Sequence, residues 1–538
     1  MSSANHPSTN DAGVAFRPAR MMRTLALACL GAALALAVML TVWGPMPARA
    51  QALEGWSDPI RLSTWGGNAG EANMVSDTSG RINAFWAERT FDTDRSLIYY
   101  SQFDGRSWTE PNAIYASWPG TPINSMAVAL DPDNEFHLVW TEGLGGPVFQ
   151  SRAALEEAGS ARAWSEPENI GLPAKELEMG VDKTGTIHIV YLVTDAEAPG
   201  IYYTQSQNQG RAWTYPLAID PDKPSTAVPD KVDLALDDQG GVHVVWSYSD
   251  ESSGTLLGRW IRYSHLLSAS ETWSTPETMD MVEFGEEFLH IPQPGIAVVG
   301  STVHVIWGAT HNREPGVTGG RGGGASSGEP DASVNRFHRM SEDRGVTWGE
   351  AQPVFGDLLG QALGDGLAVD GDGRLHFASQ LRWPQGVYHA IWNGSEWSTP
   401  DMVYLIRQDS DEEFLDRVHA HRTRIAVFAG GHLVVTFTPP DGTAQSVLYA
   451  MHELVPLDEL PSLVTDVPAT KTAPAPTGES TTAPAASAEA PVFSPSALDS
   501  AEPTPAQRES PAEPLWVGLL ATAAVISLFV VVRTIRRR

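Results

Sequence analysis

Three short sequence patterns recur in a fixed order between residues 51 and 460, and this repetition limits the possible folds more than any other feature. The first is Trp-x-x-Pro or a close variant, which begins at Trp56, Trp108, Trp164, Trp213, Trp273, Trp348 and Trp397. The second is Asp-x-x-Gly-x-x-His-x-Val-Trp, with its best copy from Asp237 to Trp246, and the third is a short aromatic run such as Ile201-Tyr-Tyr203. Turn residues separate these β-rich runs, which predicts an all-β propeller with four strands in each blade.

Seven copies of each pattern predict a seven-bladed propeller, with six blades as the alternative. In each blade the apolar run before Asp is strand one, Asp-x-x-Gly is a tight turn, and the His-containing run is strand two. The aromatic run is strand three and the Trp-x-x-Pro run is strand four. The region opens with a strand-four pattern at Trp56 and closes with a strand-three pattern near Tyr449. The first segment is therefore expected to complete the last blade, which removes an open sheet edge.

Residues that recur in nearly every blade are interpreted as structural. The six aligned histidines are predicted to be buried side chains that satisfy backbone groups: His137, His188, His243, His304, His376 and His432. They come from different blades around a ring, so they cannot converge on one metal ion. The turns at Asp131 and Asp370 superficially resemble calcium loops, but Asp and Gly are the expected residues of such turns. We therefore predict no metal site and no cofactor.

The flanking segments predict a membrane-anchored protein. Residues 1–50 contain an apolar run followed by an Ala-x-Ala pattern, which is typical of a signal peptide, with an uncleaved anchor as the alternative. Residues 461–514 are rich in Pro, Ala, Ser and Thr and are expected to be a disordered stalk. Residues 515–532 are uncharged and apolar, as in a transmembrane helix, and the basic tail 533–538 predicts a cytoplasmic C-terminus. We expect a single-pass plasma-membrane protein whose propeller, residues 51–460, is extracellular.

Charge and cysteine content exclude several classes of function. The chain has 35 basic and 65 acidic residues, a formal net charge of −30. Such a surface repels phosphate backbones, so nucleic acid is not expected as a partner. The single cysteine, Cys29, lies in the first apolar run. If that run is removed, no thiol remains for a disulfide, a Cys-based metal site or Cys catalysis.

One segment, Ser341-Glu-Asp343-Arg-Gly345-Val-Thr347-Trp348, has the form S-x-D-x-G-x-T-W. With this motif the repeat region resembles the sialidase/Asp-box (BNR-repeat) β-propeller superfamily, in which Asp-boxes are structural turns on the face opposite the active site. For a sialidase the resemblance implies six blades, three arginines that bind the substrate carboxylate, a Tyr–Glu nucleophile pair and an Asp acid/base. The Arg-Ile-Pro motif that usually carries the first arginine is not found, because Pro59-Ile-Arg61 has the wrong order.

A binding site is expected on the face formed by the loops between strands four and one and between strands two and three, since these loops are long and variable. Near the start of strand one, polar residues break the repeat and are expected to converge on the mouth of the central channel. The candidate catalytic residues are Glu178, Asp233, Asp365, Arg422 and Arg424. The candidate ligand-binding residues are Asn73, Glu88, Glu142, His290 and Trp383. Two carboxylates and an arginine can serve a glycosidase, and ordinary solvated loop charge is the alternative.

These observations favour a membrane-tethered propeller that binds a glycan or an extracellular protein without chemistry. The alternative is an exo-α-sialidase-like retaining glycosidase with a diverged catalytic set. A Tyr–Glu pair that faces three arginines at the channel mouth would favour the enzyme. Trp65, Trp118 and Trp383 on the loops of this face can stack on sugar rings or pack the loops. The sequence leaves open the ligand, the oligomeric state and whether the chain is catalytically active.

Overall fold

A computed structural model describes residues 55–454 except 195–197, 251–256, 269, 271, 282–293, 310–334, 356–364, 383–384, 408–420, 430 and 439–445. The predicted signal peptide, stalk, transmembrane helix and basic tail lie outside the described residues. Within the described part of the chain, no helix is long and apolar enough to cross a membrane.

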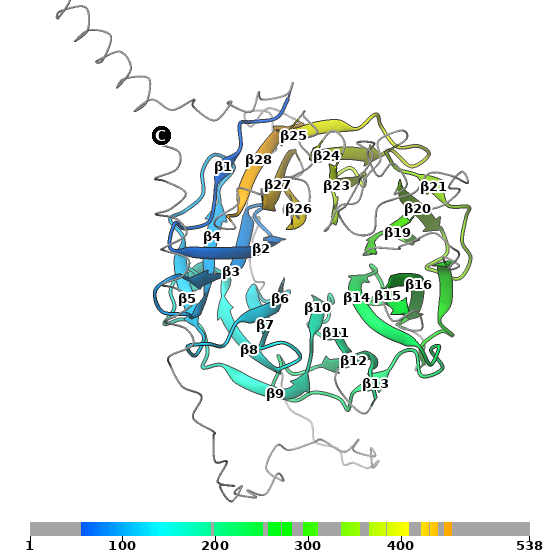
Figure 1. The fold of residues 1–538 in the computed structure, drawn as a ribbon, viewed down its shortest axis with the longest axis horizontal. Coiled ribbons are helices and arrows are strands. Elements are labelled where there is room, and N and C mark those ends of the chain that lie inside the picture. Colours follow the sequence, from blue (N-terminus) through cyan, green and yellow to red (C-terminus); the bar gives the residue numbers. More distant parts are fainter. Residues whose placement is uncertain are drawn as a thin grey trace, which may run out of the picture. The chain divides into compact units, whose positions relative to one another are not determined.

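The described strands form seven antiparallel four-stranded sheets around a central axis (Figure 1). Blades 1 and 2 contain β2 (Gly67–Ser76), β3 (Ile82–Thr90), β4 (Ser96–Phe103) and β5 (Asn112–Ala116), then β6 (Ile123–Leu130), β7 (Glu135–Glu142), β8 (Pro147–Ala154) and β9 (Glu168–Pro173). The 3-10 helix η1 (Leu155–Glu157) follows β8. Blades 3 and 4 contain β10 (Glu176–Val181), β11 (Ile187–Val193), β12 (Gly200–Ser206) and β13 (Leu217–Ala218), then β14 (Ala227–Leu236), β15 (Val242–Asp250), β16 (Leu257–Leu266) and β17 (Glu277–Met281).

The remaining blades follow in chain order. Blades 5 and 6 contain β18 (Gly295–Val299), β19 (Thr302–Ala309), β20 (Asn335–Ser341) and β21 (Gln352–Pro353), then β22 (Asp365–Val369), β23 (Leu375–Arg382), β24 (Gln385–Trp392) and β25 (Asp401–Arg407). Blade 7 combines β26 (His421–Phe428), β27 (His432–Thr438) and β28 (Leu448–Glu453) with β1 (Ile60–Arg61) from the other end of the ring.

The ring is closed by β1, which pairs with β28 so that Ile60 lies opposite Tyr449. The preceding segment continues the contact, because the backbone N–H of Met451 donates to Ser57 Oγ at 3.0 Å. The prediction of seven blades, with the first strand completing the last blade, is therefore confirmed. The six-bladed alternative is wrong.

The core consists of separate apolar clusters, most of which join neighbouring blades. Strand two of each blade is the most deeply buried, because it has a sheet partner on both sides and a blade against each face. In β11 all seven residues are buried. The strand-two tryptophans Trp86, Trp140, Trp246 and Trp307 are among the largest fully buried side chains. Truncation of one of them to alanine is expected to cost about 3–5 kcal/mol of stability.

The turn between strands one and two is held by its aspartate. Asp237 accepts hydrogen bonds from the backbone N–H groups of Gln239 at 2.8 Å and Gly241 at 2.6 Å. The same two bonds, to the residues two and four positions ahead, are made by Asp77, Asp131, Asp182 and Asp370. The fourth residue of the turn has a positive φ, +81° at Gly240. This backbone conformation explains the recurrent glycine.

All six aligned histidines are buried, as predicted. The partners of five of them are side chains, however, and not the backbone groups that the sequence suggested. His243 Nδ1 lies 2.7 Å from Tyr263 Oη, and its Nε2 lies 3.5 Å from Asp237 Oδ2. His188 and His376 also bridge the turn aspartate and an aromatic side chain of strand three. This Asp–His–aromatic connection therefore locks the turn onto strands two and three of its blade.

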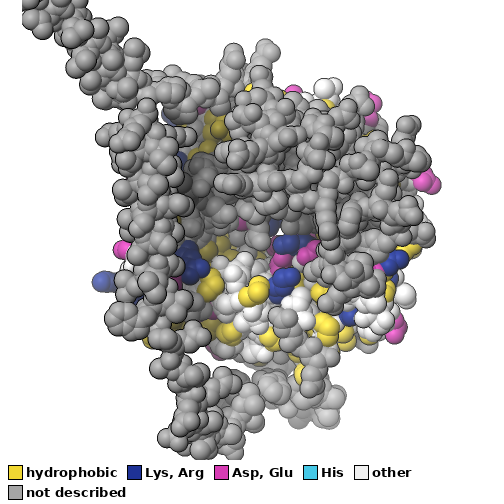
Figure 2. Space-filling view, in the orientation of Figure 1, with side chains coloured by type: hydrophobic (Ala, Val, Ile, Leu, Met, Phe, Trp, Pro, Cys, Tyr) yellow, Lys and Arg dark blue, Asp and Glu magenta, His cyan; other side chains and the backbone are white. Residues whose placement is uncertain are grey.

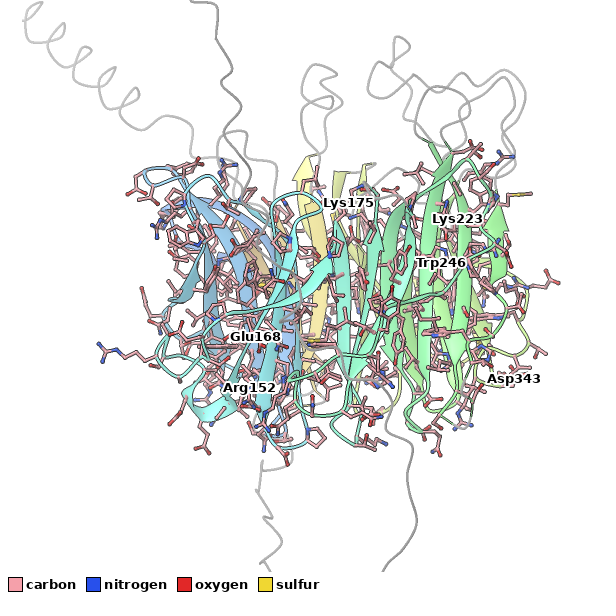
Figure 3. All side chains as sticks on the ribbon, turned by 90° about the horizontal axis from the view of Figure 1, so that it is seen from below. Arg152, Glu168, Lys175, Lys223, Trp246 and Asp343 are labelled. Atoms are coloured by element: carbon pink, nitrogen blue, oxygen red, sulfur yellow. The ribbon has the colours of Figure 1, made fainter. Side chains whose placement is uncertain are left out.

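The segment Ser341–Trp348, which has the form S-x-D-x-G-x-T-W, forms the turn between β20 and β21. Asp343 accepts hydrogen bonds from the Thr347 backbone N–H at 2.8 Å and from Thr347 Oγ1 at 2.6 Å. Gly345 has a φ of +83°, and a Cβ at this position would collide with the phenol of Tyr263. Asp343 lies toward one face of the ring, and Lys175 and Lys223, which lie on loops between strand four and strand one, lie toward the opposite face (Figure 3).

Candidate functional site

A hollow of about 830 Å³, part of it open solvent, lies where the inner strands begin around the central axis. Its charged lining residues are Glu71, Glu176, Glu178, Lys231, Asp233, Asp365 and Arg424. In the space-filling view, basic and acidic side chains lie close together near the middle of the face (Figure 2). The hollow therefore combines five carboxyl groups with two cationic groups in one place.

The inner strands are irregular where they reach this hollow. The regular register is interrupted in four of them: between Ala69 and Ala72 in β2, Ile123 and Met126 in β6, Pro229 and Lys231 in β14, and His421 and Arg424 in β26. A β-bulge redirects side chains and is common beside functional sites. Glu71 lies inside the first of these bulges, and Lys231 and Arg424 directly follow two others. The bulges thus mark the point at which these four inner strands depart from the regular repeat and line the hollow.

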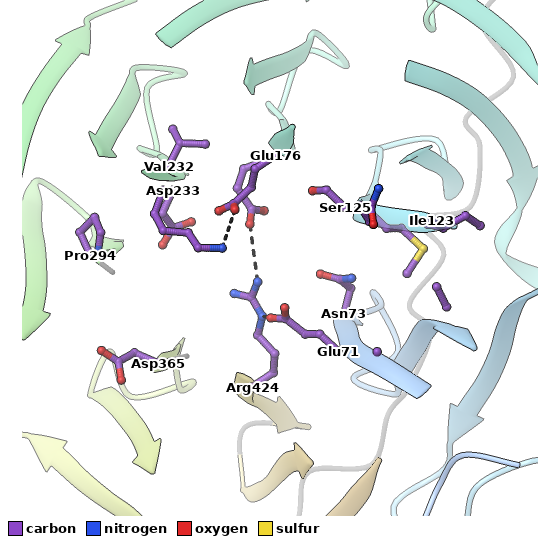
Figure 4. A pocket seen from close by; sticks show the side chains of 16 residues that line it. Glu71, Asn73, Ile123, Ser125, Glu176, Val232, Asp233, Pro294, Asp365 and Arg424 are labelled. Carbon is purple, nitrogen blue, oxygen red and sulfur yellow. Dashed lines mark hydrogen bonds and ion pairs between the residues drawn. The ribbon is translucent and has the colours of Figure 1, made fainter. Parts of the chain in front are cut away.

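Arg424 lies near the centre of the hollow (Figure 4). Its guanidinium group forms ion pairs with Glu71 of β2 and with Glu178 of β10, the latter at 3.5 Å from Nη2 to Oε1. The three residues belong to blades 7, 1 and 3, so the interactions span the axis. The side chains are 30% exposed for Arg424 and 23% exposed for Glu178. This partial burial makes the charge interactions stronger than those of a surface ion pair.

Two carboxyl groups of the hollow have altered acidity. Burial raises the pKa of Glu178 and of Asp233 above the ordinary range, while the positive charge of Arg424 opposes both shifts. Asp233 also accepts a hydrogen bond at 2.9 Å from the backbone N–H of Ile296 in the next blade. A raised pKa lets a carboxyl group keep its proton under weakly acidic conditions. It can then donate a hydrogen bond as well as accept one.

Other charged residues of the lining are paired at its edges. Lys231 Nζ lies 2.5 Å from Glu176 Oε2. The carboxylate of Asp365 is held by Arg336, at 3.0 Å from Nε to Oδ2, and accepts a hydrogen bond from Ser379 Oγ at 2.6 Å. The Arg336 and Asp365 side chains are 2% and 3% exposed. Asp365 is therefore engaged mainly in joining blades 5 and 6.

Five of the residues predicted from the sequence line the hollow: Asn73, Glu178, Asp233, Asp365 and Arg424. Arg422 lies two residues before Arg424 in β26, and the structure does not describe its side chain. His290 and Trp383 lie outside the described residues.

The predicted ligand-binding residues Glu88 and Glu142 lie outside the lining of the hollow, and both are buried. Glu142 accepts hydrogen bonds from the indole N–H of Trp140 at 3.2 Å and from the Tyr115 hydroxyl. Glu88 accepts hydrogen bonds from the indole N–H of Trp86 at 3.4 Å and from the Thr64 backbone N–H at 3.1 Å. Each carboxylate follows a strand-two tryptophan by two residues. Both carboxylates therefore anchor the repeated core tryptophan.

Sequence reasoning missed Glu71, Glu176 and Lys231, which line the hollow. They lie two residues before the candidate residues Asn73, Glu178 and Asp233, respectively. Side chains two apart in a strand point to the same face. That alternation was an available signal for Glu176, because β10 pairs without a register shift, whereas Glu71 and Lys231 lie at bulges, where the alternation is interrupted.

The described lining of the hollow contains one arginine and no tyrosine. The hydrogen-bonded pair of Tyr115 and Glu142 lies outside it, and burial raises the pKa of the Tyr115 hydroxyl, which disfavours a phenolate nucleophile. Among the residues that the structure describes, the hollow thus lacks the three arginines and the Tyr–Glu pair that the superfamily resemblance implies for a sialidase.

One cluster on the opposite face has a composition suited to a metal ion. Asp131, Glu135 and His137 place one potential ligand atom each within 4.8 Å of one another. Asp131 already holds the turn backbone and His137, and Glu135 pairs with Arg152 at 3.0 Å from Oε2 to Nη1. These contacts account for all three side chains as parts of the repeated turn.

The chain matches no protein-family model, and no curated protein matches it. Among solved structures it is similar to a protein of unknown function from Dyadobacter fermentans, with 13% identity, a TM-score of 0.43, and coverage of 75% of this chain and 100% of that chain. It is also similar to an ulvan lyase, with 12% identity, a TM-score of 0.42, and coverage of 60% and 79%. A sialidase from Trypanosoma rangeli shows 11% identity, a TM-score of 0.37, and coverage of 75% and 58%.

Proposed function

We propose that this chain is a cell-surface, membrane-anchored Asp-box propeller that binds a glycan or an extracellular protein in the hollow around Arg424. The observation that carries the proposal is the ion-pair cluster of Arg424, Glu71 and Glu178 in a hollow that is partly open to solvent. Partly buried charges of this kind contribute little to stability, because desolvation offsets their attraction. The stability of the fold therefore does not explain why three blades direct charged side chains to the same place.

The hollow has the hydrogen-bonding groups that a polar ligand requires. Arg424 and Lys231 donate hydrogen bonds, the ionised carboxylates accept them, and a protonated carboxyl at Glu178 or Asp233 does both. Hydroxyl groups also donate and accept, so they match this mixture. The bulged inner strands hold these groups on a rigid ring, which lowers the entropy cost of ordering them on binding.

A glycan array probed with the full-length chain tests this proposal. The chain is kept in an uncharged detergent without a sugar headgroup, so that the detergent does not compete. Arg424→Gln is expected to weaken binding of the captured glycan, or of an extracellular protein ligand, about 100-fold. The matched control is Arg152→Gln, which removes an Arg–Glu ion pair on the opposite face. Equal binding by the wild type and Arg424→Gln would contradict the proposal.

A second candidate function is a retaining glycosidase of exo-α-sialidase type with a diverged catalytic set. It is favoured by one observation: Glu178 and Asp233 are adjoining carboxyl groups whose pKa values are raised by burial. A carboxyl with a raised pKa is suited to act as a general acid beside a second carboxylate. The test is release of a fluorogenic leaving group from sialosides and neutral glycosides between pH 4 and 8. Turnover that is lost in Glu178→Gln supports the enzyme, and no turnover on any substrate contradicts it.

The membrane anchor belongs to the proposal and rests on the sequence of residues 515–538. Removal of this segment is expected to move the protein from the membrane fraction to the soluble fraction of expressing cells. Protease added to intact cells is expected to cleave the full-length chain, because the proposed topology places the propeller outside. Protection of the propeller until the cells are lysed would contradict that topology.

A further inference from the structure

Four large apolar side chains are exposed on the loops of blades 1 and 2, and we call them the apolar rim. They are Trp65, Phe91, Trp118 and Leu144, with exposed fractions of 83%, 60%, 73% and 71%. Trp65 and Trp118 lie between strand four and strand one, and Phe91 and Leu144 lie between strands two and three. All four therefore lie on the face that carries the hollow. Exposed apolar side chains gathered in one region are typical of a binding surface.

Backbone hydrogen bonds join the four loops into one continuous surface. The N–H of Phe91 donates to the carbonyl of Gly66 at 3.2 Å, and the N–H of Gly120 donates to the carbonyl of Asp94 at 2.8 Å. The N–H of Gly143 donates to the carbonyl of Pro122, also at 2.8 Å. The loops of Trp65, Phe91, Trp118 and Leu144 are thus connected in order around the ring.

Trp65 is held in place while one face of its ring stays open. The Arg61 guanidinium carbon lies 3.8 Å from the Trp65 ring centroid. Arg61 also donates a hydrogen bond from Nη2 to the Thr64 carbonyl at 2.7 Å, which fixes the loop just before Trp65. An indole that is braced on one side and 83% exposed presents its other face to solvent.

Trp118 is displayed by an equally fixed turn. The N–H of Thr121 donates to the carbonyl of Trp118 at 3.1 Å across Pro119 and Gly120, and Gly120 has a φ of +79°. This combination is a type II β-turn. Ser117 Oγ closes the base of the turn by donating to the Thr121 carbonyl at 2.7 Å. A rigid turn that exposes tryptophan keeps a large apolar ring in water, which a purely structural loop does not need.

The apolar rim borders the hollow. Trp65 lies five residues before Gly70, and Trp118 lies five residues before Ile123, and both Gly70 and Ile123 line the hollow. Five residues span at most about 18 Å. The rim and the hollow are therefore neighbouring parts of one surface.

We infer that the apolar rim binds an extended, uncharged polysaccharide that stacks on Trp65 and Trp118 and whose end enters the hollow around Arg424. This inference rests on the proposed function, since it names the class of ligand for the same face. Tryptophan has a flat apolar face that fits the C–H face of a pyranose ring, together with a polar N–H. The hydroxyl groups of the terminal sugar then meet the charged groups of the hollow.

Charge favours a neutral polymer over an anionic one. The chain has a net charge of −30, and within the hollow five carboxyl groups outnumber two cationic groups. A polyanion or an anionic lipid surface would approach against this field. A neutral polysaccharide pays no such cost, and its repeating rings match aromatic side chains that are spread over several loops.

Affinity electrophoresis of the full-length chain in a non-sugar, uncharged detergent tests the inference. The probes are soluble laminarin, xyloglucan, galactomannan and dextran, with alginate as the anionic control. At least one neutral polymer is expected to retard the wild type, and alginate is expected not to. Trp65→Ala and Trp118→Ala are each expected to weaken retardation about tenfold, and the double variant to abolish it. Tyr215→Ala is the matched control, because Tyr215 is 85% exposed on a different blade.

The outcomes separate this inference from the proposed function. Since Trp65 and Trp118 are exposed, their alanine variants are expected to keep the wild-type thermal unfolding midpoint, which excludes misfolding as the cause of lost binding. Retardation that is equal in the wild type and both tryptophan variants overturns the inference, and so does retardation by alginate alone or by no polymer. If a short ligand still binds the wild type and is lost in Arg424→Gln, the proposed function stands without the apolar rim. Capture of vesicles or of a peptide from the Pro-rich segment 461–514, without any polysaccharide, also overturns the inference.

Discussion

The two ends of the inner strands contrast in sequence and in structure. At the exit, five blades use the same Asp turn between strands one and two. The Asp237 carboxylate accepts hydrogen bonds from two backbone N–H groups and lies 3.5 Å from His243 Nε2 and 3.2 Å from Arg344 Nε. At the entrance, each blade offers a different residue, and four strands are bulged. The repeated end holds each blade together, whereas the irregular end carries the candidate binding site.

The contrast also distinguishes carboxylates that look alike in the sequence. Glu88 and Glu142 break the repeat as visibly as Glu178 does, yet both are buried against the indole N–H of a core tryptophan. Glu178 instead reaches across the axis to Arg424. A polar residue that departs from the repeat is therefore a stronger site candidate where its partner lies across the axis than where its partner is a core tryptophan. The following predictions test that distinction.

The largest effect is expected at the repeated end. Asp237→Ala removes the acceptor of two backbone N–H groups and of the buried His243 contact, so the turn keeps unpaired donors. We expect a loss of about 3 kcal/mol in the free energy of unfolding, measured by urea denaturation. Ligand binding by the folded fraction should stay near wild type. A loss below about 1 kcal/mol would mean that the repeated aspartate is not essential to the blade.

The second effect, at the irregular end, is expected in binding more than in stability. Arg424→Met removes the guanidinium group that pairs with Glu71 and Glu178, so the pKa of Glu178, which burial already raises, should rise further. We expect about 100-fold weaker ligand binding by isothermal titration. At weakly acidic pH the unfolding free energy should change by about 1 kcal/mol or less, because the raised pKa of Glu178 lets this group take up a proton instead of remaining an unpaired buried charge. Arg152→Met on the opposite face is the control. A loss of stability as large as that of Asp237→Ala would assign Arg424 to the scaffold.

The fold was more predictable than the site for a physical reason. Five blades share the same aspartate turn and all seven share a buried strand two, so the pattern recurs around the chain and reveals the ring and its closure. The lining of the hollow is not repeated from blade to blade, so no recurring pattern predicts it. Whether Glu71, Lys231 or Arg424 reaches the axis depends on bulges, which no single-residue pattern marks. The side-chain partners of the histidines were missed because the strand-three tyrosine or histidine becomes a neighbour only through the sheet register.

A third, moderate effect is a pH dependence that belongs to the irregular end. The pKa of Glu178 is higher in the folded protein than the ordinary value of 4.5, so the folded state binds this proton more tightly. Stability from this group is present below pH 4.5 and is lost as the pH rises through the raised pKa. Glu178→Gln removes the titration. As the pH rises, the free energy of unfolding of Glu178→Gln should therefore increase relative to that of the wild type. The total increase should be about 1.4 kcal/mol for each pH unit by which folding raises the pKa of Glu178.

Urea denaturation of both proteins at several pH values between 4 and 8 provides the measurement. Asp343→Asn is a useful control, because hydrogen bonds to Thr347 lower the pKa of Asp343 to about 2 and its difference from the wild type should be constant over this range. A constant difference for Glu178→Gln as well would show that Glu178 ionises normally. The proposed protonated carboxyl in the hollow would then be wrong.

The smallest effect is expected for Glu142→Gln, which tests whether the anchoring of Trp140 needs a charge. Glu142 Oε1 accepts hydrogen bonds from both the Trp140 indole and the Tyr115 hydroxyl, and an amide oxygen can accept both as well. We expect a loss of about 1 kcal/mol or less for Glu142→Gln in urea denaturation, and about 2–3 kcal/mol for Glu142→Ala, which leaves both donors unpaired. The pKa of Tyr115 should fall in Glu142→Gln, because the carboxylate contributes to its rise. Unchanged ligand binding in both variants would show that Glu142 has a structural role only. Loss of binding in a stable Glu142→Gln variant would show instead that the binding site reaches from the axis to the outer loops.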